Sequence, residues 1–331
     1  MTFERAAAFA PINIALVKYW GKRDPVLNLP YASSLSVALA ELGSLTVVAP
    51  SAELDANIMV VNDEPVDGAG LIKVGRVMRL IRQMAGNTEV RAGIRGVNTV
   101  PTAQGLASSA SAFAALATAG CAAYGVDADE TTLSRIARQG SGSASRSVHG
   151  GWVIWHKGER DDGLDSIGEQ LHDADYWPLR ALVAHVDIGR KKVSSTEGMQ
   201  QSARTSPFFG AWVETCERDL RDCRWAIAQR DIDALANVVE ANCLAMHSVM
   251  MATRPPLMYW QPATLAVIHA VRRLRAEGFE CLFTIDAGPS VVVLTGQGSV
   301  ERVAAEIGRI EGVARVTQTR IGGGAHLVPN G

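Results

Sequence analysis

Residues 98–120, NTVPTAQGLASSASAFAALATAG, constrain the fold of this 331-residue chain more than any other stretch. Glycine and small hydroxyl residues come first, and an alanine-rich run long enough for several helical turns follows. The pattern predicts a helix whose first N–H groups stay open, because Gly105 and Ala107 leave room for a bulky anion to approach them. Such a helix start is suited to binding phosphate. The alternative is an alanine-rich core helix in which Ser108 or Ser109 only caps the first turn.

The composition excludes several classes of protein. Hydrophobic residues make up 47% of the chain and charged residues 20%, so we expect a large core in two domains or one elongated domain. Thirty-two Lys and Arg against 34 Asp and Glu give a net charge of −2 without a basic stripe, which argues against a nucleic-acid partner. No run reaches about 18 apolar residues, and the N-terminus lacks the order of a signal peptide. We therefore expect a soluble, cytoplasmic protein with no membrane partner.

The cysteines and histidines give no sign of a disulfide framework or a metal site. The five cysteines, Cys121, Cys216, Cys223, Cys243 and Cys281, are dispersed and form no CxxC pair, so reduced thiols are expected. The seven histidines are scattered without HExxH or paired spacing, and we expect no cage of protein ligands for a metal ion.

Hydrophobic periodicity predicts strands early in the chain and helices late in it. The expected elements are hairpin strands within 35–50 broken at Gly43 and Pro50, a helix over 70–85, strands over 150–158 and 180–187 joined by an acidic surface connection, helices starting near 206, Asp231 and Pro262, and a terminal strand and tail. The change from strands to helices near 180–205 predicts a domain boundary. We place the two domains at 1–185 and 186–331.

Two further segments carry basic residues in unusual settings. In residues 9–24, FAPINIALVKYWGKRD, Lys18 and Lys22 lie four residues apart with Tyr19 between them. The alternative there is a strand followed by a solvated basic turn. Residues 137–155, ARQGSGSASRSVHGGWVIW, form a small-residue loop around Arg146, which suits the wrapping of an anion by hydroxyl, backbone and guanidinium donors. A flexible linker is the alternative, although it would join a helical pattern directly to a strand.

A lone carboxylate marks the segment 283–294, FTIDAGPSVVVL. Asp286 lies there between an apolar strand and a Gly-Pro turn. It is either a functional carboxylate or a turn aspartate that bonds its own backbone.

Together, NIALVKYWGKRD, PTAQGLASSAS, GSGSASRS and DAGP resemble the diphosphomevalonate decarboxylases of the GHMP kinase superfamily. The resemblance covers nearly the whole chain, since residues 187–200 and 246–260 also resemble their counterparts. It departs at Ser290 and Ser145, where family members often have asparagine and cysteine, and neither change is expected to remove activity. The resemblance implies an α+β, two-domain GHMP kinase fold with the active-site cleft between the domains, and a homodimer.

The resemblance also implies a reaction. The family phosphorylates the 3-hydroxyl of mevalonate 5-diphosphate with MgATP, and loss of phosphate and CO2 then gives isopentenyl diphosphate. Asp286 would orient or activate the hydroxyl, Arg146 would hold the substrate carboxylate, and Lys18 would offset repulsion between the two anionic substrates.

Binding roles follow from the same resemblance. The substrate would contact Asn13, Tyr19, Lys22, Ser141 and Ser143 together with Arg146. The ATP phosphates would lie against Gly105, Leu106, Ala107, Ser108 and Ser109, and Mg²⁺ would be held largely by phosphates and water. Two alternatives remain: a sister GHMP enzyme, namely a mevalonate 3-kinase or a decarboxylase of another phosphomevalonate, and a catalytically silent scaffold.

Overall fold

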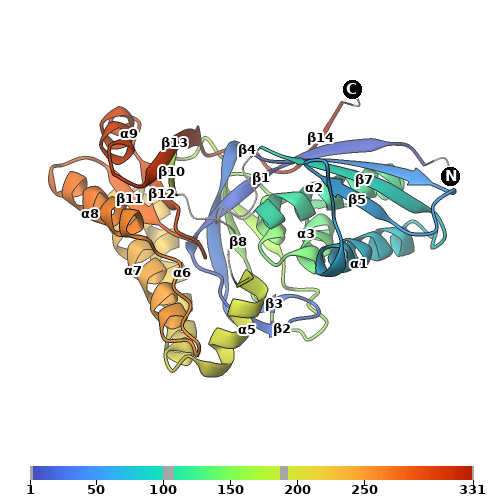
Figure 1. The fold of residues 1–331 in the computed structure, drawn as a ribbon, viewed down its shortest axis with the longest axis horizontal. Coiled ribbons are helices and arrows are strands. Elements are labelled where there is room, and N and C mark those ends of the chain that lie inside the picture. Colours follow the sequence, from blue (N-terminus) through green and yellow to red (C-terminus); the bar gives the residue numbers. More distant parts are fainter. Residues whose placement is uncertain (1–2, 100–107, 187–192, 330–331) are drawn as a thin grey trace.

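The computed structural model describes residues 3–99, 108–186 and 193–329. Two antiparallel-rich sheets with helices packed against them build a mixed α and β architecture (Figure 1). Of the expected phosphate-binding residues, Ser108 and Ser109 are described, whereas Gly105, Leu106 and Ala107 lie outside the described residues.

The first sheet is built around two long strands, β1 (Ala6–Val17) and β4 (Ser34–Ser51). Its order is β14-β1-β4-β7-β5-β6, and β8 and β9 branch from β4. The other strands are β5 (Ile58–Val61), β6 (Glu64–Pro65), β7 (Arg91–Asn98), β8 (Trp152–Trp155), β9 (Gly168–His172) and β14 (His326–Val328). The predicted terminal strand is therefore confirmed, and it pairs with β1.

Four helices belong to this half: α1 (Gly68–Met84), α2 (Ser108–Ala123), α3 (Glu130–Gly140) and the short α4 (Ala144–Ser147). Ala8 and Ala10 of β1 pack in one core with Val77 of α1 and Leu116 of α2. The helix predicted over 70–85 is confirmed as α1.

The second sheet has the order β11-β12-β10-β13 and is antiparallel throughout. Its strands are β10 (Arg180–Val186), β11 (Cys281–Thr284), β12 (Val291–Thr295) and β13 (Val313–Arg320). The helices of this half are α5 (Ser195–Thr205), α6 (Phe209–Gln229), α7 (Ile232–Met251), α8 (Pro262–Ala276) and α9 (Val300–Gly308). The predicted helix starts near 206, Asp231 and Pro262 are confirmed; Asp231 caps α7 with its side chain, and Pro262 opens α8.

The two halves share one core at the second part of β1. Ile12, Ile14 and Leu16 of β1 pack with Leu220 of α6 and Leu235 of α7. In Figure 1, β1 and β4 accordingly run from the layer of α1–α3 to that of α6 and α7. The C-terminal end of β1 thus lies where the two halves meet, and Lys18 and Tyr19 follow it directly.

The hairpin predicted within 35–50 is wrong, because β4 is one strand over its whole length. Pro11 pairs with Gly43 whereas Ile12 pairs with Leu39, so the residues between them form a bulge and not a turn. Pro50 is tolerated because it lies beyond Val48, the last residue of β4 that pairs with β1. On that edge, the strand no longer needs a backbone N–H group for a hydrogen bond to β1.

Two connections also differ from expectation. The segment around Arg146 is not a loop throughout, since α4 forms one short helical turn there and its residues are buried. The acidic connection contains the strand β9, which pairs with β8. A short ribbon of β2 (Lys22–Asp24) and β3 (Leu29–Pro30) follows β1.

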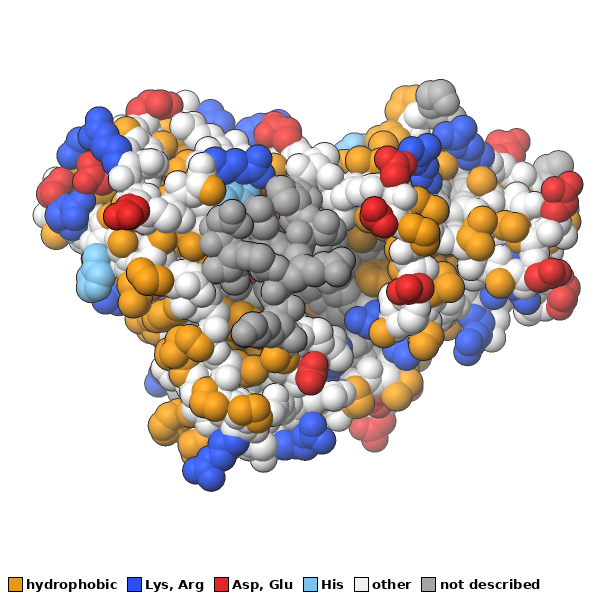
Figure 2. Space-filling view, viewed as in Figure 1, with side chains coloured by type: hydrophobic (Ala, Val, Ile, Leu, Met, Phe, Trp, Pro, Cys, Tyr) orange, Lys and Arg blue, Asp and Glu red, His pale blue; other side chains and the backbone are white. Residues whose placement is uncertain are grey.

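Charged side chains of both signs are interspersed at both ends of the face shown in Figure 2. Within the described ranges, no helix combines the length and apolar character needed to cross a bilayer.

Candidate active site

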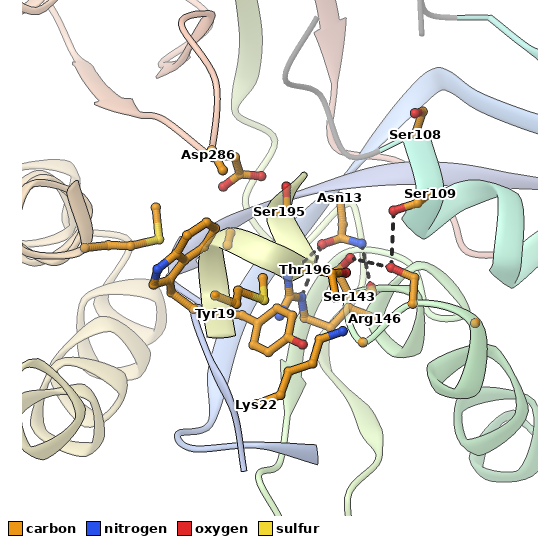
Figure 3. A pocket seen from close by; sticks show the side chains of 18 of the residues that line it. Asn13, Tyr19, Lys22, Ser108, Ser109, Ser143, Arg146, Ser195, Thr196 and Asp286 are labelled. Carbon is orange, nitrogen blue, oxygen red and sulfur yellow. Dashed lines mark hydrogen bonds between the residues drawn. The ribbon is translucent and has the colours of Figure 1, made fainter. Parts of the chain in front are cut away.

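A cavity of about 250 Å³ lies where the end of β1, the start of α2, the α3–α4 segment and the turn after β11 meet (Figure 3). The predicted site residues that line it are Asn13, Tyr19, Lys22, Ser108, Ser109, Ser141, Ser143, Arg146 and Asp286. They come from both halves of the molecule, and Figure 3 shows Asp286 facing the cavity from a different side than the α2 serines.

Lys18 and Asp286 form an ion pair at one wall of this cavity. Lys18 Nζ donates to Asp286 Oδ1 at 2.7 Å. The lysine side chain is 1% exposed and the aspartate side chain 22%, so the cation is buried while its partner opens into the cavity. Thr284 Oγ1 donates to the Ala15 carbonyl at 3.0 Å and ties β11 to β1 beside the pair. The carboxylate is therefore held in place by a buried cation, and its remaining lone pairs are available to a ligand.

Arg146 lines the cavity and is fixed there by Asn13. Its Nε and Nη2 both donate to Asn13 Oδ1, at 3.2 and 3.1 Å, and Nη1 donates to Ser34 Oγ. Asn13 Nδ2 in turn donates to the Ser143 carbonyl at 3.0 Å and to Ser147 Oγ at 2.7 Å. Among the described residues three of the five guanidinium N–H groups are used, which leaves two for an anion.

The buried guanidinium remains a cation at neutral pH. Burial lowers the pKa of Arg146 to about 10, while the negative charge of Asp286 acts in the opposite direction. The guanidinium also lies over the Trp155 ring, 5.9 Å from its centroid. A pre-oriented, partly desolvated cation of this kind interacts strongly with a carboxylate.

Tyr19 presents an unpaired hydroxyl to the cavity. Its oxygen is buried and has no hydrogen-bond partner within the described part of the chain. Burial raises the pKa of Tyr19, so the phenol stays protonated and can donate to an anion. Its ring packs edge-on against Trp155 with centroids 4.7 Å apart. Gly142 leaves the room for this arrangement, since a Cβ there would lie 2.7 Å from the Tyr19 hydroxyl oxygen.

At one corner of the cavity, Lys22 lies near two other cationic side chains, those of Lys73 and Arg76. Its Nζ donates to Asn28 Oδ1 at 2.6 Å. Burial, followed by the charges of Lys73 and Arg76, lowers the pKa of Lys22 to about 8. Burial and Arg76 lower the pKa of Lys73 as well. Bringing an anion to this corner would relieve the repulsion between the cations.

Serine hydroxyls connect the start of α2 to the α3–α4 segment. Ser109 Oγ lies 3.2 Å from Ser141 Oγ, and Ser141 Oγ lies 3.4 Å from Ser143 Oγ. Ser108, at the first turn of α2, lines the cavity beside them. The wall thus offers the hydroxyl oxygens and helix N–H groups that suit phosphates and a hard cation bound with them. No group of three or more His, Cys, Asp or Glu that could hold a metal ion occurs in residues 3–99, 108–186 and 193–329.

Comparisons with known proteins agree over nearly the whole length of the chain. The family model described as the diphosphomevalonate decarboxylase-like N-terminal domain matches residues 10–168, and that of the mevalonate 5-diphosphate decarboxylase C-terminal domain matches residues 181–323. The diphosphomevalonate decarboxylase of Aspergillus fumigatus is 38% identical over 329 residues, which cover 94% of this chain and 81% of that protein. This chain belongs to the diphosphomevalonate decarboxylase family.

Solved structures of this family share the fold. The mevalonate diphosphate decarboxylase of Staphylococcus aureus superposes with a TM-score of 0.92 at 34% identity and covers 99% of both chains. A structure described as MDDEF in complex with MVAPP, AMPPCP and magnesium superposes with a TM-score of 0.90 at 36% identity, over 99% of this chain and 100% of that one. The expected two-domain GHMP kinase fold is confirmed.

The cavity also contains residues that the sequence reasoning did not single out. Among them are Trp20, Lys73, Ser195, Thr196, Met199 and Met246. Ser195, Thr196 and Met199 lie in α5 within residues 187–200, a segment whose resemblance to the decarboxylase family could have pointed to them. Lys73 offered no such signal, because a lysine on an amphipathic helix ordinarily faces solvent.

Proposed function

We propose that this chain catalyses the ATP-dependent decarboxylation of mevalonate 5-diphosphate to isopentenyl diphosphate, with release of ADP, phosphate and CO2, through phosphorylation of the 3-hydroxyl. The observation that carries this proposal is the convergence of Asp286, Arg146 and the start of α2 on one cavity. Phosphoryl transfer needs a group that positions the hydroxyl and a site for phosphates. Decarboxylation needs in addition a cation that holds the carboxylate, and Arg146 supplies one.

Asp286 is assigned to the 3-hydroxyl of the substrate. An alcohol is a weak acid, so a carboxylate that accepts its proton in a hydrogen bond acts mainly by aiming the oxygen at the γ-phosphate. The bond from Lys18 Nζ supports this role because it fixes the carboxylate and leaves one oxygen for the substrate. The ammonium also reduces repulsion between ATP and an anionic substrate.

Arg146 is assigned to the substrate carboxylate, with Asn13 as the group that orients the guanidinium. Its two remaining N–H groups can hold both carboxylate oxygens, which fixes the C–C bond that breaks. Departure of the phosphate from C3 draws the electrons of that bond into the new double bond, and CO2 leaves.

The diphosphate end of the substrate is assigned to Tyr19, Lys22, Ser141 and Ser143. Two observations support this assignment. The buried hydroxyl of Tyr19 has no hydrogen-bond partner among the described residues, and the ammonium group of Lys22 lies close to that of Lys73. Both arrangements cost free energy that a bound anion would offset. ATP is assigned to Gly105–Ser109, the last two residues of which line the cavity. AMPPCP is an ATP analogue, and its complex with MDDEF and magnesium supports ATP and Mg²⁺ as the cofactors. Bound with the phosphates and the α2 serine hydroxyls, Mg²⁺ would neutralise part of the charge on the transferred group.

The domain division, the cellular location and the oligomeric state are part of the same proposal. We divide the chain into a nucleotide-binding domain at 1–185 and a C-terminal domain at 186–331, and we place the enzyme in the cytoplasm as a homodimer. The five free cysteines support the location, and the family resemblance supports the homodimer. The proposed boundary lies at the end of β10, a strand that pairs with β12 and β13 of the second sheet.

One assay tests the proposed reaction. ADP formation and CO2 release are measured with mevalonate, its 5-phosphate and its 5-diphosphate. We expect equal amounts of ADP and CO2 and the highest kcat/KM with the 5-diphosphate. ADP without CO2 would indicate a kinase, preference for another phosphomevalonate would indicate a sister decarboxylase, and ligand binding without turnover would indicate a scaffold.

A further inference from the structure

The main chain at Lys18 is held by a buried amide on α7. Lys18 follows the last residue of β1, so its N–H group leaves the sheet at this point. It donates to Asn242 Oδ1 at 2.8 Å, across 224 residues of sequence. Asn242 is fully buried, and a buried polar side chain is costly unless its hydrogen bonds are made. The amide therefore satisfies an N–H group that water cannot reach.

The orientation of this amide is set by a second buried residue. Asn242 Nδ2 donates to Asp219 Oδ2 on α6 at 2.8 Å, and Asp219 is 8% exposed. An ionised carboxylate can only accept hydrogen bonds, so the NH₂ end of Asn242 must face Asp219 and the oxygen must face Lys18. Asp219 thus determines which end of the amide meets the main chain of the lysine.

The neighbouring turn of α7 holds the segment that carries Asp286. The N–H of Ile285 donates to Cys243 Sγ at 3.2 Å, and His247 Nε2 lies 3.3 Å from the Ile285 carbonyl. Burial and the charge of Lys18 lower the pKa of His247 to about 4, so the ring is neutral at physiological pH and Nε2 carries the proton that the carbonyl accepts. One face of α7 therefore contacts both chain segments of the Lys18–Asp286 pair.

We propose that Asn242 and Asp219 are positioning residues that set the main chain of Lys18, and so the ammonium and the carboxylate of Asp286, in the geometry needed for phosphoryl transfer. The inference rests on the function proposed above. It assigns no contact with substrate to either residue. It requires that a change of the Asn242–Asp219 bond alters kcat in enzyme that is folded and binds ATP normally.

A cycle of three variants tests the proposal, because the bond can be broken and then rebuilt in reverse. Asn242→Asp replaces the amide with a carboxylate that faces the carboxylate of Asp219. We expect the resulting repulsion to lower kcat about tenfold to hundredfold, which is the loss expected when a reacting group is displaced by about 1 Å. Asp219→Asn keeps an acceptor for the amide, and kcat should stay within about threefold. The double variant restores one donor and one carboxylate, and kcat should recover to within about fivefold of wild type.

Folding and function are read separately in the same samples. Melting temperature and ATP affinity are measured for every variant, and Glu240→Gln is the matched control. Glu240 is a buried carboxylate of α7 that pairs with Arg275 at 2.6 Å, so its change should lower stability and leave kcat unaltered. If Asn242→Asp does not fold, Asn242→Ala, which removes both bonds without adding charge, replaces it in the comparison.

The wild type is assayed alongside with mevalonate and both of its phosphorylated forms, and kcat ratios are taken for whichever substrate it uses. If the wild type does not turn over the 5-diphosphate, the proposed function is wrong, and this result does not depend on the variants. A folded Asn242 variant with kcat within about twofold of wild type would overturn the inference. So would a double variant that folds like wild type but turns over no faster than Asn242→Asp.

Discussion

Replacing Asp286 by asparagine separates the chemistry of the carboxylate from its contribution to the fold. Asparagine has nearly the same size and keeps an oxygen that can accept from Lys18, but it removes the negative charge. Loss of one partner from a fully buried ion pair costs about 3–5 kcal/mol. Because 22% of the Asp286 side chain is exposed and one acceptor remains, we expect a smaller loss of unfolding free energy, about 1–3 kcal/mol.

The effect of Asp286→Asn on catalysis should be much larger than its effect on stability. A positioned acid or base contributes about 10²–10⁴-fold, so kcat should fall in that range while ATP affinity stays within about threefold. ADP and CO2 should fall together, because the carboxylate acts before the phosphorylated intermediate forms. The assays are rapid quench for both products, urea unfolding, and titration with a fluorescent ATP analogue.

The same substitution at Asp231 is the control, since that carboxylate caps α7 through the N–H groups of Asp233 and Ala234 and lies outside the cavity. Asp231→Asn should leave kcat unchanged. If Asp286→Asn folds, binds ATP normally and retains most of the wild-type kcat, Asp286 serves only as the structural partner of Lys18.

Three further perturbations follow from the geometry of the cavity. Lys22, with a pKa of about 8, loses its proton as the pH rises through that value, so kcat/KM for the organic substrate should fall above about pH 8, and Lys22→Arg should shift that fall to higher pH. Gly142→Ala places a methyl group 2.7 Å from both the Tyr19 hydroxyl oxygen and the Trp155 ring, so urea unfolding should show a loss of about 1–3 kcal/mol and the KM for the organic substrate should rise. Arg146→Gln should lower CO2 release more than ADP formation, and rapid quench should detect a 3-phosphorylated intermediate; an equal loss of both products would contradict a role in carboxylate departure.

Local sequence patterns determined several elements of this protein. The apolar spacing over 70–85 and the proline at 262 predicted α1 and the start of α8, because helical periodicity and N-terminal preferences act over a few residues. The bulge in β4 escaped prediction. A glycine within an apolar run is compatible with a turn as well as with a bulge, and only the pairing of Gly43 with Pro11 on β1 distinguishes them.

In the candidate site, too, local sequence patterns determined some features and long-range packing determined others. Motif chemistry singled out Lys18 and Asp286 separately, but their ion pair joins residues 268 positions apart and depends on how the two sheets pack. Lys73 and Asn242 lie on helices whose local pattern resembles that of many solvated or core helices. Which side chain reaches the cavity, or meets the end of β1, is decided by long-range packing of buried surfaces, and a short window of sequence does not contain that information.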